Sequence, residues 1–143
     1  MVYVQKKELE FAKNPLPCQC IAYESRKISL VPPWERIEDN FEIIDGDYTL
    51  AEGIELIFLP GHTPGSMGVS VNTEKGKYLI AGDLIQSNIV FDEMPCGLPK
   101  PSGVHINLEE YYESLKKVMK YGDYILPSHD FKVLENLVYP PKI

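Results

Sequence analysis

The sequence has few cysteines, no basic cluster and no long apolar run. Its three cysteines include a C-x-C pair at Cys18 and Cys20, which matches neither a zinc finger nor a disulfide framework, so we expect reduced thiols. Its 21 acidic residues outnumber 14 basic ones, for a net charge of −7. This balance argues against nucleic acid as a partner.

Long hydrophobic segments are also missing. The longest apolar stretches, about five to six residues, are far shorter than the roughly 20 residues needed to span a bilayer. The first residues lack the charged and then apolar pattern of a signal peptide. We therefore expect a cytoplasmic protein without membrane association. The composition, 44% hydrophobic and 24% charged over 143 residues, is typical of one globular domain, so we expect residues 1–143 to form a single domain.

Turn-forming residues divide the first part of the chain into short strands. The runs that alternate or are continuously apolar are Met1–Val4, Phe41–Ile44, Ile54–Leu59, Met67–Val71 and Tyr78–Ala81. The last four of these runs are separated by turn-forming segments that each contain glycine, and this predicts antiparallel ribbons.

Helical periodicity dominates the second part of the chain. Apolar side chains from Leu108 to about Lys120 recur at helical spacing, with Asn107 as the N-cap and Gly122 as the stop. We expect a shorter helix over Lys6–Lys13, a buried strand over Tyr124–Leu126 and a final helix over Phe131–Val138. Strands followed by helix, strand and helix indicate an α+β fold, with a sheet covered by helices on one face.

Three apolar runs end in a side chain that can bind a metal ion. His62, Asp83 and His129 each follow a predicted strand and a pair of small or turn-forming residues. A strand fixes the backbone, and the turn directs the next side chain to the rim of the sheet. Imidazole and carboxylate groups bind zinc, manganese or iron, and one carboxylate can bridge two ions.

Each of these residues also has an ordinary structural interpretation. His62 can be hydrogen-bonded to the backbone within its Gly/Pro loop, and Asp83 can be a turn or N-cap residue. His129 can lie at the start of the last helix, capped by Ser128 or Asp130. Their recurrence in one short chain favours the metal-ligand interpretation.

Three motifs resemble the metallo-β-lactamase superfamily. They are PGHTPGS at Pro60–Ser66, AGD at Ala81–Asp83 and PSHD at Pro127–Asp130. Within that superfamily the chain is most similar to acyl-homoserine-lactonase-like hydrolases, through Val4–Pro15, the Gly103–His105 segment and the helix that contains Tyr111 and Tyr112.

The resemblance implies an αββα sandwich with two metal ions at one edge. His62 would bind the first ion, His129 the second, and Asp83 would bridge both. The implied reaction is hydrolysis of a lactone, ester or amide carbonyl in a small acyl substrate by metal-activated hydroxide. Zinc is the expected metal, with manganese or iron as alternatives.

The superfamily's H-x-H-x-D-H string is missing from this sequence, whose only histidines are His62, His105 and His129. Each ion would then have two protein ligands here, although catalytic zinc usually has three. We therefore expect the C-terminal portion of the fold, an incomplete domain that binds metal weakly or not at all alone. An N-terminal half of the fold, or self-association, is the expected partner.

Substrate-binding residues are predicted less sharply. Gln86 stands where the resembling lactonases have a tyrosine that touches the substrate carbonyl, and its amide can donate a hydrogen bond instead. Phe91, Met94 and Leu98 belong to a loop that lines an apolar pocket or packs as ordinary surface, and His105 belongs to a substrate loop or has a structural role. The alternative to an enzyme part is a non-catalytic remnant or split-subunit binding module of the same fold.

Overall fold

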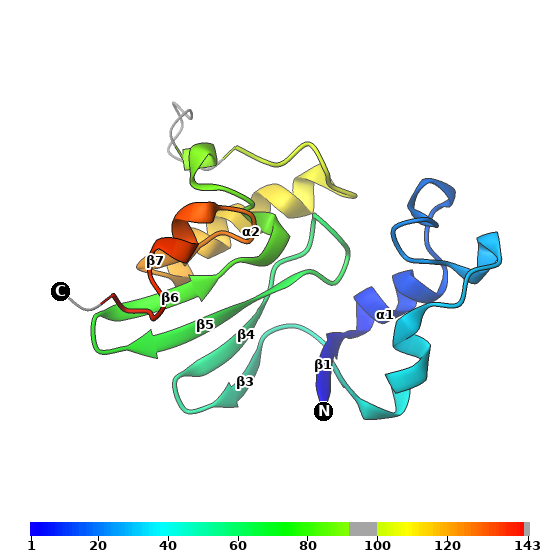
Figure 1. Cartoon of the computed structure of the whole chain (residues 1–143), viewed down its shortest axis with the longest axis horizontal. Helices are drawn as coiled ribbons and strands as arrows, with labels where there is room; N and C mark the ends of the chain where they lie inside the picture. The colour runs from blue at the N-terminus through cyan, green and yellow to red at the C-terminus, as the bar shows by residue number, and fades with distance from the viewer. Residues whose placement is uncertain (92–99, 142–143) are drawn as a thin grey trace. The chain divides into compact units, whose positions relative to one another are not determined.

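The computed structural model describes residues 1–91 and 100–141 (Figure 1). Contacts between residues divide the chain into two compact units, Met1–Asp45 and Gly46–Ile143. The expectation of a single domain over 1–143 stays a prediction. Among the described residues, no helix has the length and apolar character required to cross a bilayer.

The first unit pairs two short strands in parallel. β1 (Val2–Gln5) leads directly into α1 (Lys6–Lys13), as predicted, and β2 (Phe41–Ile44) pairs with β1 from Val2↔Phe41 to Gln5↔Ile44. The expectation that β2 belongs to the antiparallel ribbons was wrong. A parallel pair needs a long crossover, and residues 6–40 supply one.

Short 3₁₀ turns fill that crossover. They are Pro17–Gln19, Arg26–Ile28 and Pro33–Asn40. Cys18 and Cys20 are both free, which agrees with the expected reduced thiols, and Cys96 lies outside the described residues.

The second unit contains a five-stranded sheet. Its strands are β3 (Tyr48–Ala51), β4 (Ile54–Phe58), β5 (Met67–Thr73), β6 (Gly76–Ile80) and β7 (Tyr124–Leu126), in the order β3-β4-β5-β6-β7. Neighbours from β3 to β6 are antiparallel, as predicted, whereas β6 and β7 are parallel. β3 was not predicted from the sequence; it is a four-residue strand whose side chains are all exposed.

Strand direction decides which loops meet. β4 and β6 are both antiparallel to β5 and therefore run the same way, and β7 is parallel to β6. The C-terminal ends of these three strands consequently lie at one end of the sheet, where the loops that contain His62, Asp83 and His129 begin (Figure 1).

The core lies between one face of the sheet and α2 (Leu108–Tyr121). Ile57 and Leu79 from the sheet pack with Tyr111, Leu115 and Val118 from the helix, and all five are at most 1% exposed. The predicted start of the helix is confirmed, because the Asn107 side chain accepts hydrogen bonds from the backbone N–H groups of Glu109 and Glu110.

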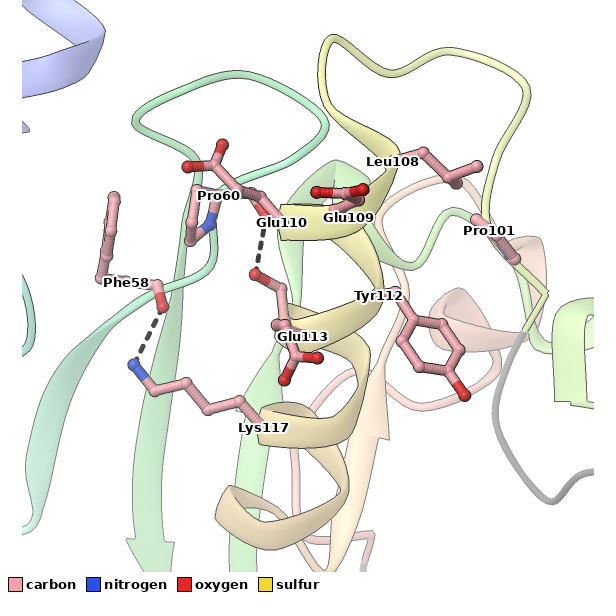
Figure 2. Close-up of a pocket in the computed structure, with 10 residues that line it drawn as sticks. Phe58, Pro60, Pro101, Leu108, Glu109, Glu110, Tyr112, Glu113 and Lys117 are labelled. Atoms are coloured by element: carbon pink, nitrogen blue, oxygen red, sulfur yellow. Dashed lines mark hydrogen bonds between the residues drawn. The ribbon is translucent and has the colours of Figure 1, made fainter.

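Polar contacts attach the helix to β4 and to the residues that follow it. Ser114 Oγ donates to the carbonyl of Pro60 at 2.6 Å, and Lys117 Nζ donates to the carbonyl of Phe58 at 2.9 Å (Figure 2). Lys117 also pairs with Asp47, whose carboxylate accepts the backbone N–H of Phe58.

The opposite face of the sheet is apolar and partly open. Leu56, Val69 and Ile80 share this face because they are register partners on adjacent strands. Tyr124 occupies the same face through Tyr78, its partner on β6, and stacks on it with ring centroids 4.7 Å apart. Ile80 is 46% and Tyr124 47% exposed.

Two expectations near the C-terminus were wrong. β7 is not fully buried, as the exposed Tyr124 shows, because β7 is the last strand of the sheet. In place of a helix over Phe131–Val138 there is a 3₁₀ turn over Phe131–Glu135. Leu134 and Leu137 are exposed, so this segment lacks the buried apolar face that stabilises a longer helix.

Candidate functional site

The His62 loop is built against the first turn of α2. Gly61 has a φ of +130°, and a Cβ at this position would lie 2.3 Å from both the N and Cα atoms of Tyr111. The Gly61 carbonyl accepts hydrogen bonds from the backbone N–H groups of Ile106 and Asn107, at 2.9 and 3.1 Å. Only glycine fits this conformation and this close approach without displacement, so the loop holds His62 at a fixed place beside the helix.

A backbone carbonyl orients the His62 ring. Nδ1 of His62 lies 2.8 Å from the carbonyl oxygen of Val104. Because a carbonyl can only accept, we infer that Nδ1 has the proton and that Nε2 is the unprotonated nitrogen of the neutral ring. Nε2 lies 3.5 Å from Oδ2 of Asp83, and the side chain is 15% exposed.

Asp83 lies in a 3₁₀ turn, Gly82–Leu84, directly after β6. Its Oδ1 accepts a hydrogen bond from Ser128 Oγ at 2.8 Å and lies 3.0 Å from Nε2 of His129. The two oxygens of one carboxylate therefore each face a different histidine.

The His129 loop is aligned with the segment that follows Asp83. The backbone N–H of Ser128 donates to the carbonyl of Ile85 at 3.1 Å, and that of His129 donates to the carbonyl of Gln86 at 2.8 Å. The His129 side chain is 63% exposed, compared with 43% for Asp83. The site thus opens to solvent on the His129 side.

The chemical types of these donors suit divalent ions. Two imidazole nitrogens and a carboxylate that presents one oxygen to each suit a bridged pair of ions. In residues 1–91 and 100–141, no group of three or more His, Cys, Asp or Glu side chains is arranged to hold a metal ion. Each ion would therefore have two ligands from this part of the chain, fewer than the three typical of catalytic zinc.

The other predicted site residues are only partly brought to this site. Gln86 continues the Asp83 segment, and its Oε1 accepts a hydrogen bond from Ser102 Oγ at 3.2 Å. His105 Nδ1 lies 2.8 Å from the carbonyl of Ser102, so its hydrogen bond is within its own loop. Met94 lies outside the described residues, as does Leu98, and the Phe91 side chain is not described.

The groove drawn in Figure 2 is separate from the site formed by His62, Asp83 and His129. It has a volume of about 880 Å³ and lies along α2, with an apolar lining that includes Phe58, Leu108 and Tyr112. His62, Asp83 and His129 do not line it.

Two residues with a role at the site were missed by sequence reasoning. Ser128 was considered only as a helix cap, yet its hydroxyl donates to Asp83. Tyr111 was assigned to the apolar face of α2, which is correct for its ring, but its hydroxyl reaches the carbonyls of the Asp83 turn. Burial raises the pKa of Tyr111. A tyrosine at a core position is the signal, because a buried phenol needs a hydrogen-bond partner.

Comparison with known proteins identifies the family. The family model of the metallo-beta-lactamase superfamily matches residues 2–129, and the chain belongs to this superfamily. The resemblance seen in the sequence is thereby confirmed.

The curated relatives include N-acyl homoserine lactonases. One from Bacillus thuringiensis is 32% identical over 80 residues, which cover 54% of this chain and 32% of the relative. Another, from Bacillus sp., is 47% identical over 67 residues, or 46% of this chain and 27% of the relative. The matches therefore span about a third of the length of these relatives.

Solved structures give the same fold. An N-acyl homoserine lactone hydrolase with bound N-hexanoyl-L-homoserine has a TM-score of 0.61 at 24% identity, with 99% of this chain and 52% of that chain covered. AidC, a dizinc quorum-quenching lactonase, has a TM-score of 0.62 at 20% identity, with 97% and 48% covered. The α+β metallo-β-lactamase fold is confirmed, and the chain spans about half of these structures, as expected for a partial domain.

Proposed function

We propose that this chain supplies the C-terminal part of a dinuclear metal-dependent hydrolase that acts on an acyl carbonyl in a lactone, ester or amide. The observation that carries the proposal is the placement of His62 and His129 on opposite oxygens of Asp83. The lactonase relatives favour a lactone among these substrates.

His62 would hold one ion, His129 the second, and Asp83 would bridge them. Zinc suits these ligands, as do manganese and iron, and the dizinc lactonase among the similar structures supports zinc. When bound, such ions supply Lewis acidity, which lowers the pKa of water and polarises a carbonyl oxygen. With two ligands per ion, we expect this chain alone to bind zinc weakly.

Gln86 would orient the substrate carbonyl. Ser102 Oγ accepts a hydrogen bond from the backbone N–H of Val104, so its own proton is free to be donated to Gln86 Oε1. With its oxygen engaged in this way, the amide of Gln86 presents its nitrogen as the donor end. A carbonyl oxygen of the substrate is the acceptor that suits it.

The missing ligands would come from an N-terminal half of the fold. The open apolar face around Ile80 and Tyr124 supports this partner, because exposed apolar sheet faces generally mark an interaction surface. Self-association is the other way to cover the face.

A cytoplasmic location stays a prediction.

Reconstitution tests the proposal. The 143-residue chain is mixed with a separately produced N-terminal half that contains an H-x-H-x-D-H motif, and bound zinc is counted by elemental analysis after dialysis. We expect about two zinc ions per complex and lactone hydrolysis. Asp83→Ala should abolish the zinc binding and the hydrolysis. His105→Asn is the matched control, because His105 is hydrogen-bonded within its own loop, and it should retain both ions.

The alternative is a non-catalytic binding module of the same fold, which the count of two ligands per ion favours. It predicts that the two halves associate without zinc and without hydrolysis. A complex that binds no zinc, or an Asp83→Ala complex that still binds two ions, would refute the enzyme proposal.

A further inference from the structure

Tyr111 is a buried residue that contacts more than one loop of the site. Its side chain is fully buried in the core. The hydroxyl donates to the carbonyl of Leu84, lies 3.4 Å from the carbonyl of Asp83, and accepts the backbone N–H of Ser102 at 3.3 Å. One side chain therefore contacts the backbone of the Asp83 turn and of the loop that contains Ser102.

The same residue supports the His62 loop through its backbone. The N and Cα atoms of Tyr111 lie so close to Gly61 that a methyl group there would clash. Residues just before α2 hold the Gly61 carbonyl, and the carbonyl of Val104 holds the His62 ring. A shift at the start of α2 would therefore move the His62 imidazole.

The segment that follows the Asp83 turn is hydrogen-bonded to the loop that contains His129. Leu84, the residue that receives the Tyr111 hydroxyl bond, is followed directly by Ile85 and Gln86. The carbonyls of these two residues accept the backbone N–H groups of Ser128 and His129. Any movement of the Leu84 carbonyl would be transmitted to His129 by these two hydrogen bonds.

We propose that Tyr111 is a positioning residue of the site: its hydroxyl fixes the turn that presents the Asp83 carboxylate to both imidazoles. Its effect on zinc rests on the proposed metal function, whereas its effect on the loops does not. Neighbouring Tyr112 is the matched control, because it lies on the same helix but is 40% exposed.

Amide hydrogen exchange of the 143-residue chain tests the role without metal. In Tyr111→Phe, we expect the amides of Ser128 and His129 to exchange at least about tenfold faster, while amides of the β4–β5 ladder change little, as expected for local opening. Tyr112→Phe should change neither group. Equal acceleration of all amides, or none, would show that Tyr111 only adds general stability and would overturn the proposal.

Zinc titration is the second readout. We expect Tyr111→Phe to weaken zinc binding by about 10- to 100-fold, the usual effect of removing a group that orients ligands, and Tyr112→Phe to leave it unchanged. Unchanged zinc affinity in Tyr111→Phe would overturn the role at the metal site. If the unmodified chain and its reconstituted complex bind no zinc, the proposed function fails, and exchange alone then decides the positioning role.

A measurement on the unmodified chain covers the case in which Tyr111→Phe does not fold. The buried hydroxyl proton of Tyr111 should give a slowly exchanging NMR resonance with a nuclear Overhauser effect to Leu84. A hydroxyl proton in fast exchange with water would refute the proposed hydrogen bond.

Discussion

Gly61→Ala should disrupt the site and the core together. At φ +130°, a residue with a side chain is strained by about 1–3 kcal/mol. The added Cβ would lie 2.3 Å from Tyr111 backbone atoms, so the loop and α2 must separate. Separation weakens the two hydrogen bonds to the Gly61 carbonyl, each worth about 0.5–1.5 kcal/mol. We expect the free energy of unfolding to fall by about 3–5 kcal/mol.

Substitutions at two other glycines separate the cost of backbone strain from the cost of the close contact with α2. Gly46 has a φ of +94°, but a Cβ added there would meet no atom within 4 Å, so Gly46→Ala should cost only the backbone strain, about 1–3 kcal/mol. Gly103 does not have a φ in the left-handed range and a Cβ added there would meet no atom within 4 Å, so Gly103→Ala should change the free energy of unfolding by no more than about 0.5 kcal/mol.

Urea unfolding followed by far-ultraviolet circular dichroism provides the three free energies. The predicted order of destabilisation is Gly61 first, then Gly46, then Gly103. A Gly61→Ala variant that loses no more stability than Gly46→Ala would mean that the close contact with α2 costs nothing to relax. The account of a loop fixed against the helix would then be refuted.

Three further substitutions each test the role of one side chain. Ser114→Ala removes the buried donor to Pro60 and should cost about 1–3 kcal/mol in urea unfolding; a neutral result would contradict that bond. Lys117→Met removes both the partly exposed pair with Asp47 and the hydrogen bond to the Phe58 carbonyl, and it should cost about 1–2 kcal/mol, with the ion-pair part of that cost smaller at about 1 M salt. Burial raises the pKa of Tyr78, so stability present below about pH 10 is lost as the pH rises through the folded-state pKa. Tyr78→Phe should reduce this alkaline loss, and an unchanged dependence of the urea midpoint on pH would refute it.

The ends of the strands could be predicted because particular residue types mark them in the sequence. An apolar run followed by Pro-Gly, Ala-Gly or Pro-Ser marks the point where a strand stops, and the next side chain is His62, Asp83 or His129. Helix α2 was predictable for the same reason, since its apolar period, Asn107 cap and Gly122 stop are all visible in the sequence.

Pairing and long-range contacts could not be predicted in this way. Phe41–Ile44 has the same pattern whether it pairs in parallel with β1 or joins a ribbon, and only tertiary contacts decide. The groups that orient the site are mostly backbone carbonyls, such as those of Val104 and Leu84. Every residue has a carbonyl, so no sequence pattern distinguishes the ones that face a histidine or a tyrosine.

The geometry of the sheet also explains why the site is built on one side only. The three predicted ligand residues follow strands that end at the same end of a single sheet, and the carboxylate between the histidines directs one oxygen toward each of them. Side chains that leave one sheet end reach an ion from that side alone, so a full set of three ligands per ion requires donors from another element.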